Sequence, residues 1–156
     1  MTKFVPKLVN LEKIGIQRTN NMITLNDVLL IKSKQFIESN GNLVPIEFDK
    51  TIPFKPKRTF FVYGVPDKSA RGKHAHFKTK QLITCINGHI SVRLHDGFNE
   101  GFYELYCGDS IYIPNMIWDE QVYHSVNTVL VSLCSTNYNT KDYIHDFNEF
   151  IKIKNG

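Results

Sequence analysis

Two histidines and an arginine stand close together in this chain, at Arg71, His74 and His76. Alternate side chains of an extended strand point to the same face, so both imidazoles are expected to enter one cavity, with Arg71 at its mouth. Paired imidazoles beside a guanidinium suit either a metal site or acid–base chemistry on an anionic substrate. The rest of the sequence helps to decide between these two hypotheses.

The length and charge of the chain limit its class. Its 156 residues are enough for one domain with a sizeable core. We expect residues 1–27 to form an N-terminal extension or arm and residues 28–156 to form the domain. The formal net charge is +4, and lysines and arginines are spread along the chain rather than gathered in a stripe. This pattern predicts no nucleic-acid partner and favours a small phosphorylated substrate.

The cysteines and the N-terminus indicate the compartment. Cys85, Cys107 and Cys134 lie in apolar runs and match no zinc-binding spacing, so free, buried thiols in a reducing compartment are expected. The first residues lack the apolar segment of a signal peptide, and no window approaches the roughly 18 apolar residues of a membrane span. The sequence therefore predicts a soluble cytoplasmic protein without a membrane partner.

Short apolar or alternating segments recur along the chain, separated by turn residues. Such runs are typical of strands, and many short strands at nearly regular spacing predict a β-sandwich or barrel. Asn87-Gly88 is a hairpin signal, and Asp96-Gly97 marks another turn. The expected strands cover residues 28–31, 43–48, 59–63, 81–86, 90–94, 103–107, 110–113, 120–126 and 128–134.

A helix is expected only near the C-terminus. Four side chains there fall on one helix face, at positions i, i+4, i+7 and i+8: Tyr143, Phe147, Phe150 and Ile151. Asn139 or Thr140 is the expected N-cap, with Asp142 near the positive end of the helix dipole. The predicted class is therefore all-β with one short C-terminal helix.

Two stretches resemble the motifs of the cupin superfamily of β-barrels. The first motif would comprise Gly72, His74, His76 and Gly88, and the second Gly108 and Pro114. The glutamate and the third histidine of these motifs are missing, because Thr79-Lys80-Gln81 and Asp119 occupy their places. A transition-metal site with three protein ligands needs that third donor, so the metal hypothesis is weakened. Two histidines and one aspartate still allow a facial triad, which keeps a metal-dependent oxygenase as an alternative.

Without a metal, the two histidines are candidates for proton transfer. An unperturbed histidine titrates near pH ~6.5, so both of its forms are available near neutral pH. General acid–base catalysis by one such group supplies roughly 10²–10⁴-fold in rate. Two imidazoles on one face are therefore suited to removing a proton from one carbon and delivering a proton to its neighbour.

The segment Arg71-Gly72-Lys73-His74-Ala75-His76, followed by a glutamine, an apolar strand and Asn-Gly, resembles the nucleotide-linked deoxysugar 3,4-ketoisomerases. These are metal-free cupins of bacterial surface-sugar pathways. The resemblance covers about residues 28–152 and includes residues 41–47, 114–118 and 142–150. It implies a cupin jelly-roll barrel, paired as a homodimer whose N-terminal strands are exchanged or packed between subunits, with no cofactor and no metal. The implied substrate is dTDP-4-keto-6-deoxyglucose, whose ketone would move from C4 to C3 through an enediol.

The residues suggest roles in that reaction. His74 is the candidate base for the C3 proton, although the roles of His74 and His76 are interchangeable at this stage. The enolate oxygen needs a hydrogen-bond donor, which is worth roughly 3–4 kcal/mol when well placed. His76, Tyr63 or Tyr123 is the expected donor. Asp119 stands where related ketoisomerases often carry a histidine, so it is expected to shuttle protons or to orient a histidine.

Other residues are expected to bind the nucleotide. Arg71 matches the arginine that holds the diphosphate in the related metal-free 3,5-epimerases, and Arg58 is a candidate second arm. Trp118 is expected to stack on the thymine or to form a wall of the sugar pocket, and Tyr123 is also assigned to the substrate. The remaining histidines are expected at the surface or in turns: His89, His95, His124 and His145.

Two further functions stay open from the sequence. One is 3,5-epimerisation of a similar sugar nucleotide, although His-Ala-His departs from the single-histidine pattern of those epimerases. The other is a non-catalytic module that binds a sugar nucleotide. Such a module would keep the pocket and the arginines but would have no use for paired imidazoles.

Overall fold

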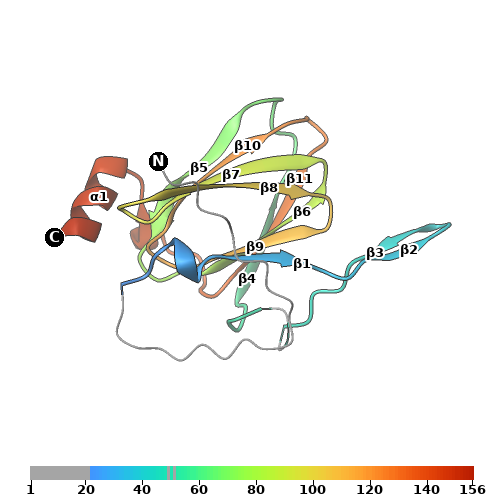
Figure 1. Ribbon diagram of the computed structural model, residues 1–156, viewed down its shortest axis with the longest axis horizontal. Coiled ribbons are helices and arrows are strands. Elements are labelled where there is room, and N and C mark those ends of the chain that lie inside the picture. Colours follow the sequence, from blue (N-terminus) through green and yellow to red (C-terminus); the bar gives the residue numbers. More distant parts are fainter. Residues whose placement is uncertain (1–21, 49, 51) are drawn as a thin grey trace.

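Two five-stranded antiparallel sheets face each other in the computed structural model, which describes residues 22–48, 50 and 52–156 (Figure 1). The first sheet has the order β1 (Leu29–Lys32), β9 (Asp109–Ile113), β6 (Gln81–Asn87), β11 (Val129–Cys134) and β4 (Arg58–Val62). The second has the order β12 (Tyr143–Ile144), β5 (Ala70–His76), β10 (Trp118–Tyr123), β7 (His89–His95) and β8 (Glu100–Tyr106). The predicted all-β class is therefore confirmed, as a jelly-roll sandwich of two sheets.

Alternating side chains create the core between the sheets. Along β8, Gly101, Tyr103 and Leu105 are buried, whereas Phe102, Glu104 and Tyr106 are exposed. Strand β7 repeats the pattern, because its apolar side chains alternate with half-buried polar ones. This period of two is what buries one face of a sheet and leaves the other in water. The main core joins Ile90, Val92, Leu94, Ile83, Ile111 and Leu130 from both sheets.

The segment Asn87-Gly88 does not form the expected hairpin. β6 pairs with β9 and β11, whereas β7 pairs with β8 and β10, so the chain crosses at this point from one sheet to the other. Gly88 has a φ of +83°, and a Cβ built on it would lie 2.9 Å from Thr128 Cα. Glycine is thus needed for a sharp corner of the sandwich rather than for a two-residue turn. The turn at Asp96-Gly97 does join the paired strands β7 and β8.

The C-terminal helix is shorter than the sequence pattern predicts. It is α1 (Phe147–Asn155), and Asp146 is its N-cap, accepting a hydrogen bond from the backbone N–H of Glu149 at 2.7 Å. Asn139 instead caps a short 3₁₀ turn, η2 (Thr140–Asp142). Tyr143 therefore lies in a strand, because β12 pairs with the free edge of β5 before the helix begins. Phe150 is fully buried, and Phe147 and Ile151 pack beside it, as the helical spacing predicted.

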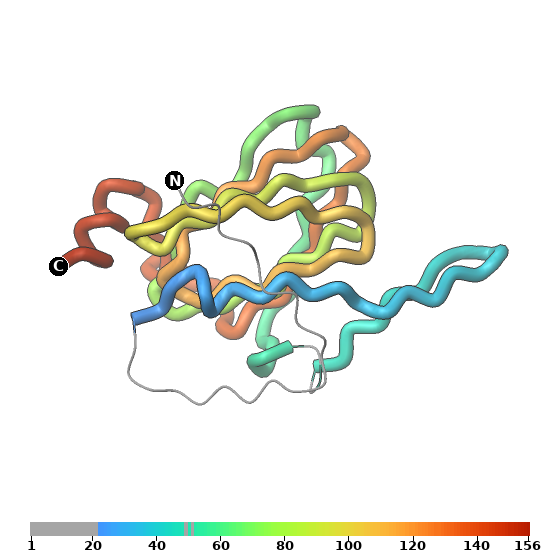
Figure 2. Tube along the Cα trace, in the orientation of Figure 1, coloured from blue at the N-terminus to red at the C-terminus, as the bar shows by residue number. Residues whose placement is uncertain are grey.

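A hairpin and the helix occupy opposite ends of the sandwich (Figure 2). The hairpin consists of β2 (Phe36–Glu38) and β3 (Gly41–Leu43), which among the described strands pair only with each other and extend away from the body. Before β1, the 3₁₀ turn η1 (Leu25–Asp27) inserts Leu25 into the main core. The predicted N-terminal arm otherwise lies mostly outside the described residues. Its boundary at residue 27 remains a prediction.

The thiols only partly match the expectation. Cys85 and Cys134 are free and buried, but Cys107 is exposed because it lies in the turn between β8 and β9. None of the helices in the described residues is long and apolar enough to cross a membrane.

Candidate active site

A bulge in β5 places Arg71 and His74 on the same side of the sheet. These residues are three positions apart, so strict alternation would send their side chains to opposite faces. In the register with β10, Gly72 and His74 face consecutive residues, which leaves Lys73 without a partner. Gly72 and Lys73 have φ values of +78° and +57°. The extra residue re-aims the strand, and both Arg71 and His74 line one pocket.

This pocket lies between the two sheets and has a volume of about 440 Å³. Its lining comes from β4, β6 and β11 of the first sheet (Arg58, Phe60, Val62, Gln81, Ile83 and Leu130), from β5, β10 and β12 of the second (Arg71, Gly72, His74, Gln121 and Tyr143), and from Tyr138 and His145. Arg58 and Arg71 therefore reach the pocket from opposite sheets. Two guanidinium groups and an imidazole around one cavity suit an anionic substrate that undergoes proton transfer.

His76 lies behind His74, at the buried end of β5 and outside the pocket lining, so His74 alone of the two expected imidazoles lines the cavity. The two rings are 4.9 Å apart and nearly perpendicular. His76 Nδ1 lies 3.1 Å from Asp142 Oδ2, and because Asp142 also accepts backbone N–H groups, the shared hydrogen belongs to Nδ1. Burial, assisted by the charge of His74, lowers the pKa of His76 to about 4, although Asp142 acts in the opposite direction. At neutral pH His76 is thus a neutral imidazole, and its buried Nε2 has no partner among the described residues.

Asp119 lies opposite His74 in the β5–β10 register. Its side chain is buried, and its Oδ2 accepts a hydrogen bond from Gln121 Nε2 at 2.8 Å. Burial raises the pKa of Asp119 to about 6, while attraction to His74 and the bond from Gln121 act to lower it. Oδ1 is buried without a partner in the described part of the chain. Asp119 therefore changes protonation state near neutral pH, beside the candidate base.

Tyr143 stands between the histidines and the arginine of the first sheet. It faces His76 across the β5–β12 pair, and its ring centroid is 4.4 Å from that of His76 and 5.1 Å from that of His74. His145 stacks on it at 5.4 Å. Burial alone would lower the pKa of Arg58, but interactions with Tyr143 and a cysteine sulfur raise it, so the guanidinium remains charged. The pocket thus presents a phenol next to a fixed positive charge.

Comparison with known proteins assigns this arrangement to a family. The profile of the family described as WxcM-like, C-terminal (FdtA) matches residues 26–155. The chain belongs to this family. It is also 35% identical over 127 residues to a TDP-4-oxo-6-deoxy-alpha-D-glucose-3,4-oxoisomerase of Aneurinibacillus thermoaerophilus, covering 79% of this chain and 89% of the relative. The resemblance predicted from the motifs is thereby confirmed.

Solved structures of the same group superpose on the chain. The sugar 3,4-ketoisomerase of Thermoanaerobacterium thermosaccharolyticum in complex with TDP gives a TM-score of 0.79 at 33% identity, covering 84% of this chain and 96% of that one. A histidine-to-asparagine variant of that enzyme, solved with TDP-4-keto-6-deoxyglucose, gives 0.77 at 32% identity over 82% and 94%. A 3,4-ketoisomerase of Helicobacter canadensis gives 0.79 at 29% identity over 83% and 98%. The predicted cupin jelly roll is consistent with all three.

Tyr63 does not line the pocket, contrary to the expectation from the sequence. Tyr63 follows β4, its side chain is 69% exposed, and it packs beside Phe61 on the outer surface. Strand parity explains this position, because Arg58, Phe60 and Val62 face the pocket and Phe61 faces water. The expectation that Tyr63 donates a hydrogen bond to the enolate oxygen is therefore wrong.

Trp118 and Tyr123 also lie outside the pocket lining. Along β10, Asp119, Gln121 and Tyr123 point inward, so Trp118 points outward, where it packs against Phe147 and Phe150 of α1 and donates a hydrogen bond to Glu120 at 3.0 Å. This position corrects the expected stacking on a thymine. Tyr123 is fully buried in the main core.

Several pocket or supporting residues escaped the sequence analysis, among them Tyr138, Asp142, Tyr143 and His145. Tyr143 and Asp142 were assigned to a helix, His145 was expected at the surface, and Tyr138 was not considered. The string from Asp142 to Ile144 belongs to the segments that carry the family resemblance, and that was the available signal. The contribution of this segment to the site depends on its pairing with β5, about 66 residues earlier in the chain.

Replacing Gly72 by alanine is expected to disturb the bulge and lower activity. The new Cβ would lie 2.5 Å from Asp119 Oδ1 and 3.0 Å from the Asp119 carbonyl oxygen, at a φ of +78°. We expect a loss of about 2–3 kcal/mol in the free energy of unfolding, from left-handed strain and the clash together. Gly64→Ala is the matched control, because Gly64 has a φ of +68° but no atom of the described residues within 4 Å of its Cβ position. Equal losses in the two variants, measured by urea denaturation, would contradict the assigned clash.

Below neutral pH, His76 and Asp119 are expected to change the free energy of unfolding in opposite directions. Unfolded histidine takes up a proton below pH 6.5, whereas folded His76 does so only near pH 4, so its contribution to stability falls as the pH drops between these values. This shift corresponds to about 3 kcal/mol. The raised pKa of Asp119 acts oppositely, because the folded carboxyl keeps its proton up to about pH 6 and the unfolded one only to about 3.8. Stability from Asp119 therefore rises as the pH drops across that range.

Asp119→Asn removes one of these opposed contributions. The free energy of unfolding of this variant should fall more steeply from neutral pH to about pH 4 than that of the unaltered protein. Urea denaturation at several pH values measures the slope. The exposed substitution Asp67→Asn should keep the original slope. Parallel profiles for Asp119→Asn and the unaltered chain would show that folding does not raise the pKa of Asp119.

Proposed function

We propose that this chain is a 3,4-ketoisomerase that converts dTDP-4-keto-6-deoxyglucose into the corresponding 3-keto sugar. The observation that carries the proposal is the convergence of His74, Arg58 and Arg71 on one pocket, with His76 directly behind. Family membership and relatives with this activity support it. The reaction fits bacterial surface-glycan synthesis in the cytoplasm.

The proposed reaction needs only proton transfers. The C4 carbonyl acidifies the hydrogen on C3, and His74 removes that proton to form an enediol(ate). Reprotonation at C4, with loss of the proton from the C3 hydroxyl, leaves the ketone on C3. Oxidation at C3 equals reduction at C4, so the conversion requires no external oxidant or cofactor.

Asp119 and Tyr143 fit supporting roles in this reaction. An ionised Asp119 opposite His74 stabilises the imidazolium that forms when the base takes the proton. The phenol of Tyr143 is the candidate donor for the developing enolate oxygen, since the structure leaves Tyr63 and Tyr123 outside the pocket lining. His76, a neutral imidazole oriented by Asp142, offers its free Nε2 as a proton acceptor at the rear of the site.

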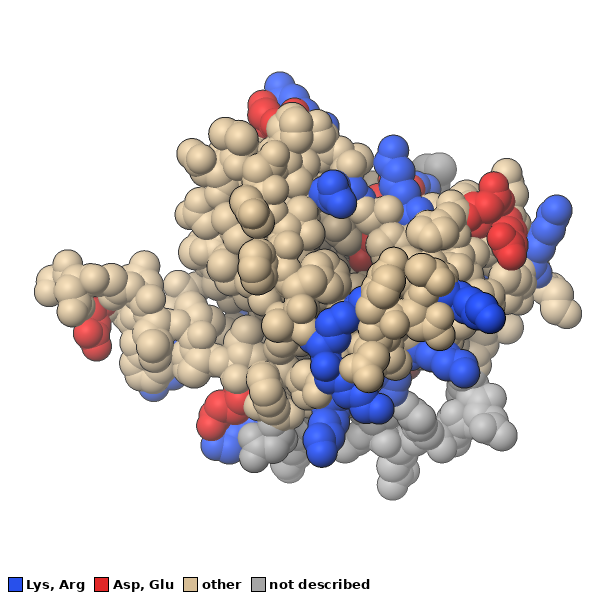
Figure 3. Space-filling model, turned by 180° about the vertical axis from the view of Figure 1, so that it is seen from behind, with Lys and Arg blue, Asp and Glu red and all other residues tan. Residues whose placement is uncertain are grey.

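Arg71 and Arg58 are the proposed ligands of the diphosphate. Lys and Arg side chains gather on the face of the molecule turned away from the viewer in Figure 1, where they favour the approach of an anion (Figure 3). Arg71→Ala is expected to raise KM roughly tenfold with kcat within about twofold, because binding of the diphosphate is equally strong in the ground and transition states. Steady-state kinetics measure the split, and Lys68→Ala, an exposed cation in the preceding loop, is the control. An effect confined to kcat would contradict this role.

A homodimer is the proposed assembly. The β2–β3 hairpin extends from the body and exposes Ile37 and Leu43, which supports packing of this N-terminal part against a second copy. Light scattering coupled to size-exclusion chromatography measures the mass in solution. A monomer at micromolar concentration would contradict the assembly and leave the catalytic proposal to stand on the pocket alone.

Product analysis tests the proposed reaction directly. Incubation of dTDP-4-keto-6-deoxyglucose with the protein in D₂O should give a 3-keto product by NMR that carries deuterium at C4, and 4-keto sugar that re-forms from the enediol should carry deuterium at C3. Label at C3 and C5 without movement of the ketone would indicate a 3,5-epimerase. Binding without any exchange would indicate a non-catalytic module, and loss of turnover on metal removal would indicate a metal-dependent enzyme.

A further inference from the structure

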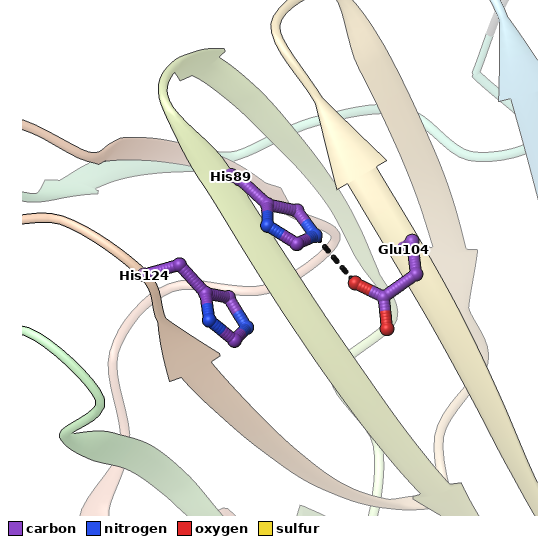
Figure 4. Close-up of side chains that lie close together, drawn as sticks. All are labelled: His89, Glu104 and His124. Atoms are coloured by element: carbon purple, nitrogen blue, oxygen red, sulfur yellow. Dashed lines mark hydrogen bonds and ion pairs between the residues drawn. The ribbon is translucent and has the colours of Figure 1, made fainter.

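Three side chains with metal-binding atoms lie together on the outer face of the second sheet, away from the pocket lining. They are His89 at the start of β7, Glu104 in β8 and His124 directly after β10 (Figure 4). The backbone N–H of His124 donates to the carbonyl of His89 at 3.2 Å, so these two residues are direct neighbours across adjacent strands. Glu104 lies diagonal to His89, because Ser91 is its partner in the register.

The donor atoms of this cluster converge. His89 Nε2 lies 2.5 Å from Glu104 Oε2, and one ligand atom from each of the three residues lies within 4.8 Å of the others. Ligand atoms around a tetrahedral Zn²⁺ with bonds near 2.1 Å are about 3.4 Å apart. Small rotations of these side chains would shorten the separations between ligand atoms from as much as 4.8 Å to this tetrahedral value. The cluster therefore matches a three-ligand site in both donor type and spacing.

Neighbouring side chains hold the ligands in place. The His89 ring is stacked between Tyr106 at 4.5 Å and His124 at 4.4 Å, with interplanar angles of 6° and 17°. Ser91 Oγ donates to Glu104 at 2.8 Å and lies 2.7 Å from His124 Nε2, so one hydroxyl joins two of the three ligands. Outer-shell hydrogen bonds of this kind orient metal ligands. The site is partly preorganised before any ion binds.

The local charge also suits a cation. Glu104 supplies one negative charge and the imidazoles supply neutral nitrogen donors. Arg93, two residues beyond Ser91 on the same face, is paired with Glu100 at 3.0 Å and Glu120 at 3.1 Å, which offsets its charge. Two nitrogens and one carboxylate oxygen are the donor set of zinc sites with one open position, and hard ions such as Mg²⁺ prefer oxygen alone.

We propose that His89, Glu104 and His124 form a binding site for a divalent transition-metal ion of the zinc class, separate from the ketoisomerase pocket. The ion links β8, the edge strand of the sheet, through β7 to β10. Water fills the open coordination position because the cluster faces solvent. Binding to the folded state alone raises the melting temperature by mass action.

Titration with ZnCl₂ tests this site in the full chain. Calorimetry should show one ion bound per chain, with affinity reduced at least about tenfold in Glu104→Gln and in His124→Ala. Glu100→Gln is the matched control, since Glu100 lies on the same face of the same strand, and His74→Asn removes an imidazole of the pocket. Both controls should keep the affinity within about twofold. Zinc should raise the melting temperature of the unaltered chain and of the controls, but not of the two cluster variants.

A second measurement reports coordination rather than affinity. Co²⁺ should give the visible absorption of a four-coordinate site, and Glu104→Gln should abolish it. The proposal is overturned if no ion binds, or if binding is lost in His74→Asn and kept in the cluster variants, which would assign the ion to the pocket. Both cluster variants replace exposed side chains, so their melting temperatures without metal should match that of the unaltered chain.

Discussion

His74→Asn is expected to lower kcat by roughly 10²–10⁴-fold while the protein stays folded, the largest loss of activity among single substitutions in this chain. Asparagine keeps a polar side chain of similar reach but cannot accept and return a proton near neutral pH. His74 is half-buried, and its side chain makes no hydrogen bond within the described part of the chain, so the melting temperature should change little. Coupled turnover assays and thermal unfolding measure the two quantities.

The same experiment separates the two histidines. If His74 is the base, His74→Asn should also abolish exchange of the C3 hydrogen with solvent deuterium. His124→Asn serves as the matched control, because His124 is exposed and outside the pocket lining, and it should retain full turnover. Exchange at C3 that persists in His74→Asn and disappears in His76→Asn would transfer the role of base to His76.

Asp142→Asn is expected to produce the second large effect, on stability as well as on rate. Asp142 accepts hydrogen bonds from the backbone N–H groups of Lys78 (2.8 Å) and Thr79 (3.2 Å), from the Thr79 hydroxyl and from His76. An amide replaces one acceptor oxygen by an NH₂ group, which faces these donors in a buried site. We expect a loss of about 3 kcal/mol in the free energy of unfolding, since a buried donor is left unpaired.

Asp142 also positions His76, so kcat should fall roughly 10²-fold in Asp142→Asn with KM little changed. Asp146→Asn is the matched control, because Asp146 is the N-cap of α1 and asparagine caps a helix equally well. That control should keep both its stability and its rate.

A double-mutant cycle of Asp142→Asn with His76→Asn shows whether the rate effect passes through His76. Additive losses in kcat would mean that Asp142 acts on the reaction by some other route. A non-additive result, in which the second substitution has little further effect, is the expected outcome.

Local patterns in the sequence were sufficient for part of the site. The alternation of His74 and His76 places both rings on one face of β5, and the strand pattern predicted an all-β fold. Arg71 does line the pocket, but simple alternation would have sent it to the opposite face from His74. The bulge at Gly72 and Lys73 brings it back, and that bulge depends on the register with β10.

For other residues, the face of the sheet to which the side chain points depends on the register of the strand, which the sequence alone does not set. Trp118 and Asp119 are adjacent in β10, and a shift of one residue would exchange their faces. The structure turns Asp119 toward His74 and Trp118 toward α1. The covering helix suits this parity, because Phe147 and Phe150 offer Trp118 an apolar surface outside the sheet.

The sequence by itself determined the class of the fold, the family and the identity of the paired imidazoles with their arginine, since these follow from short-range spacing and motif. Only the tertiary structure decided that Asp142 supports His76, that Tyr143 joins the pocket, and that Arg58 and Arg71 line one pocket from opposite sheets. These contacts join strands far apart in the chain, and pairing and register between such strands arise from packing of the whole sandwich rather than from any local pattern.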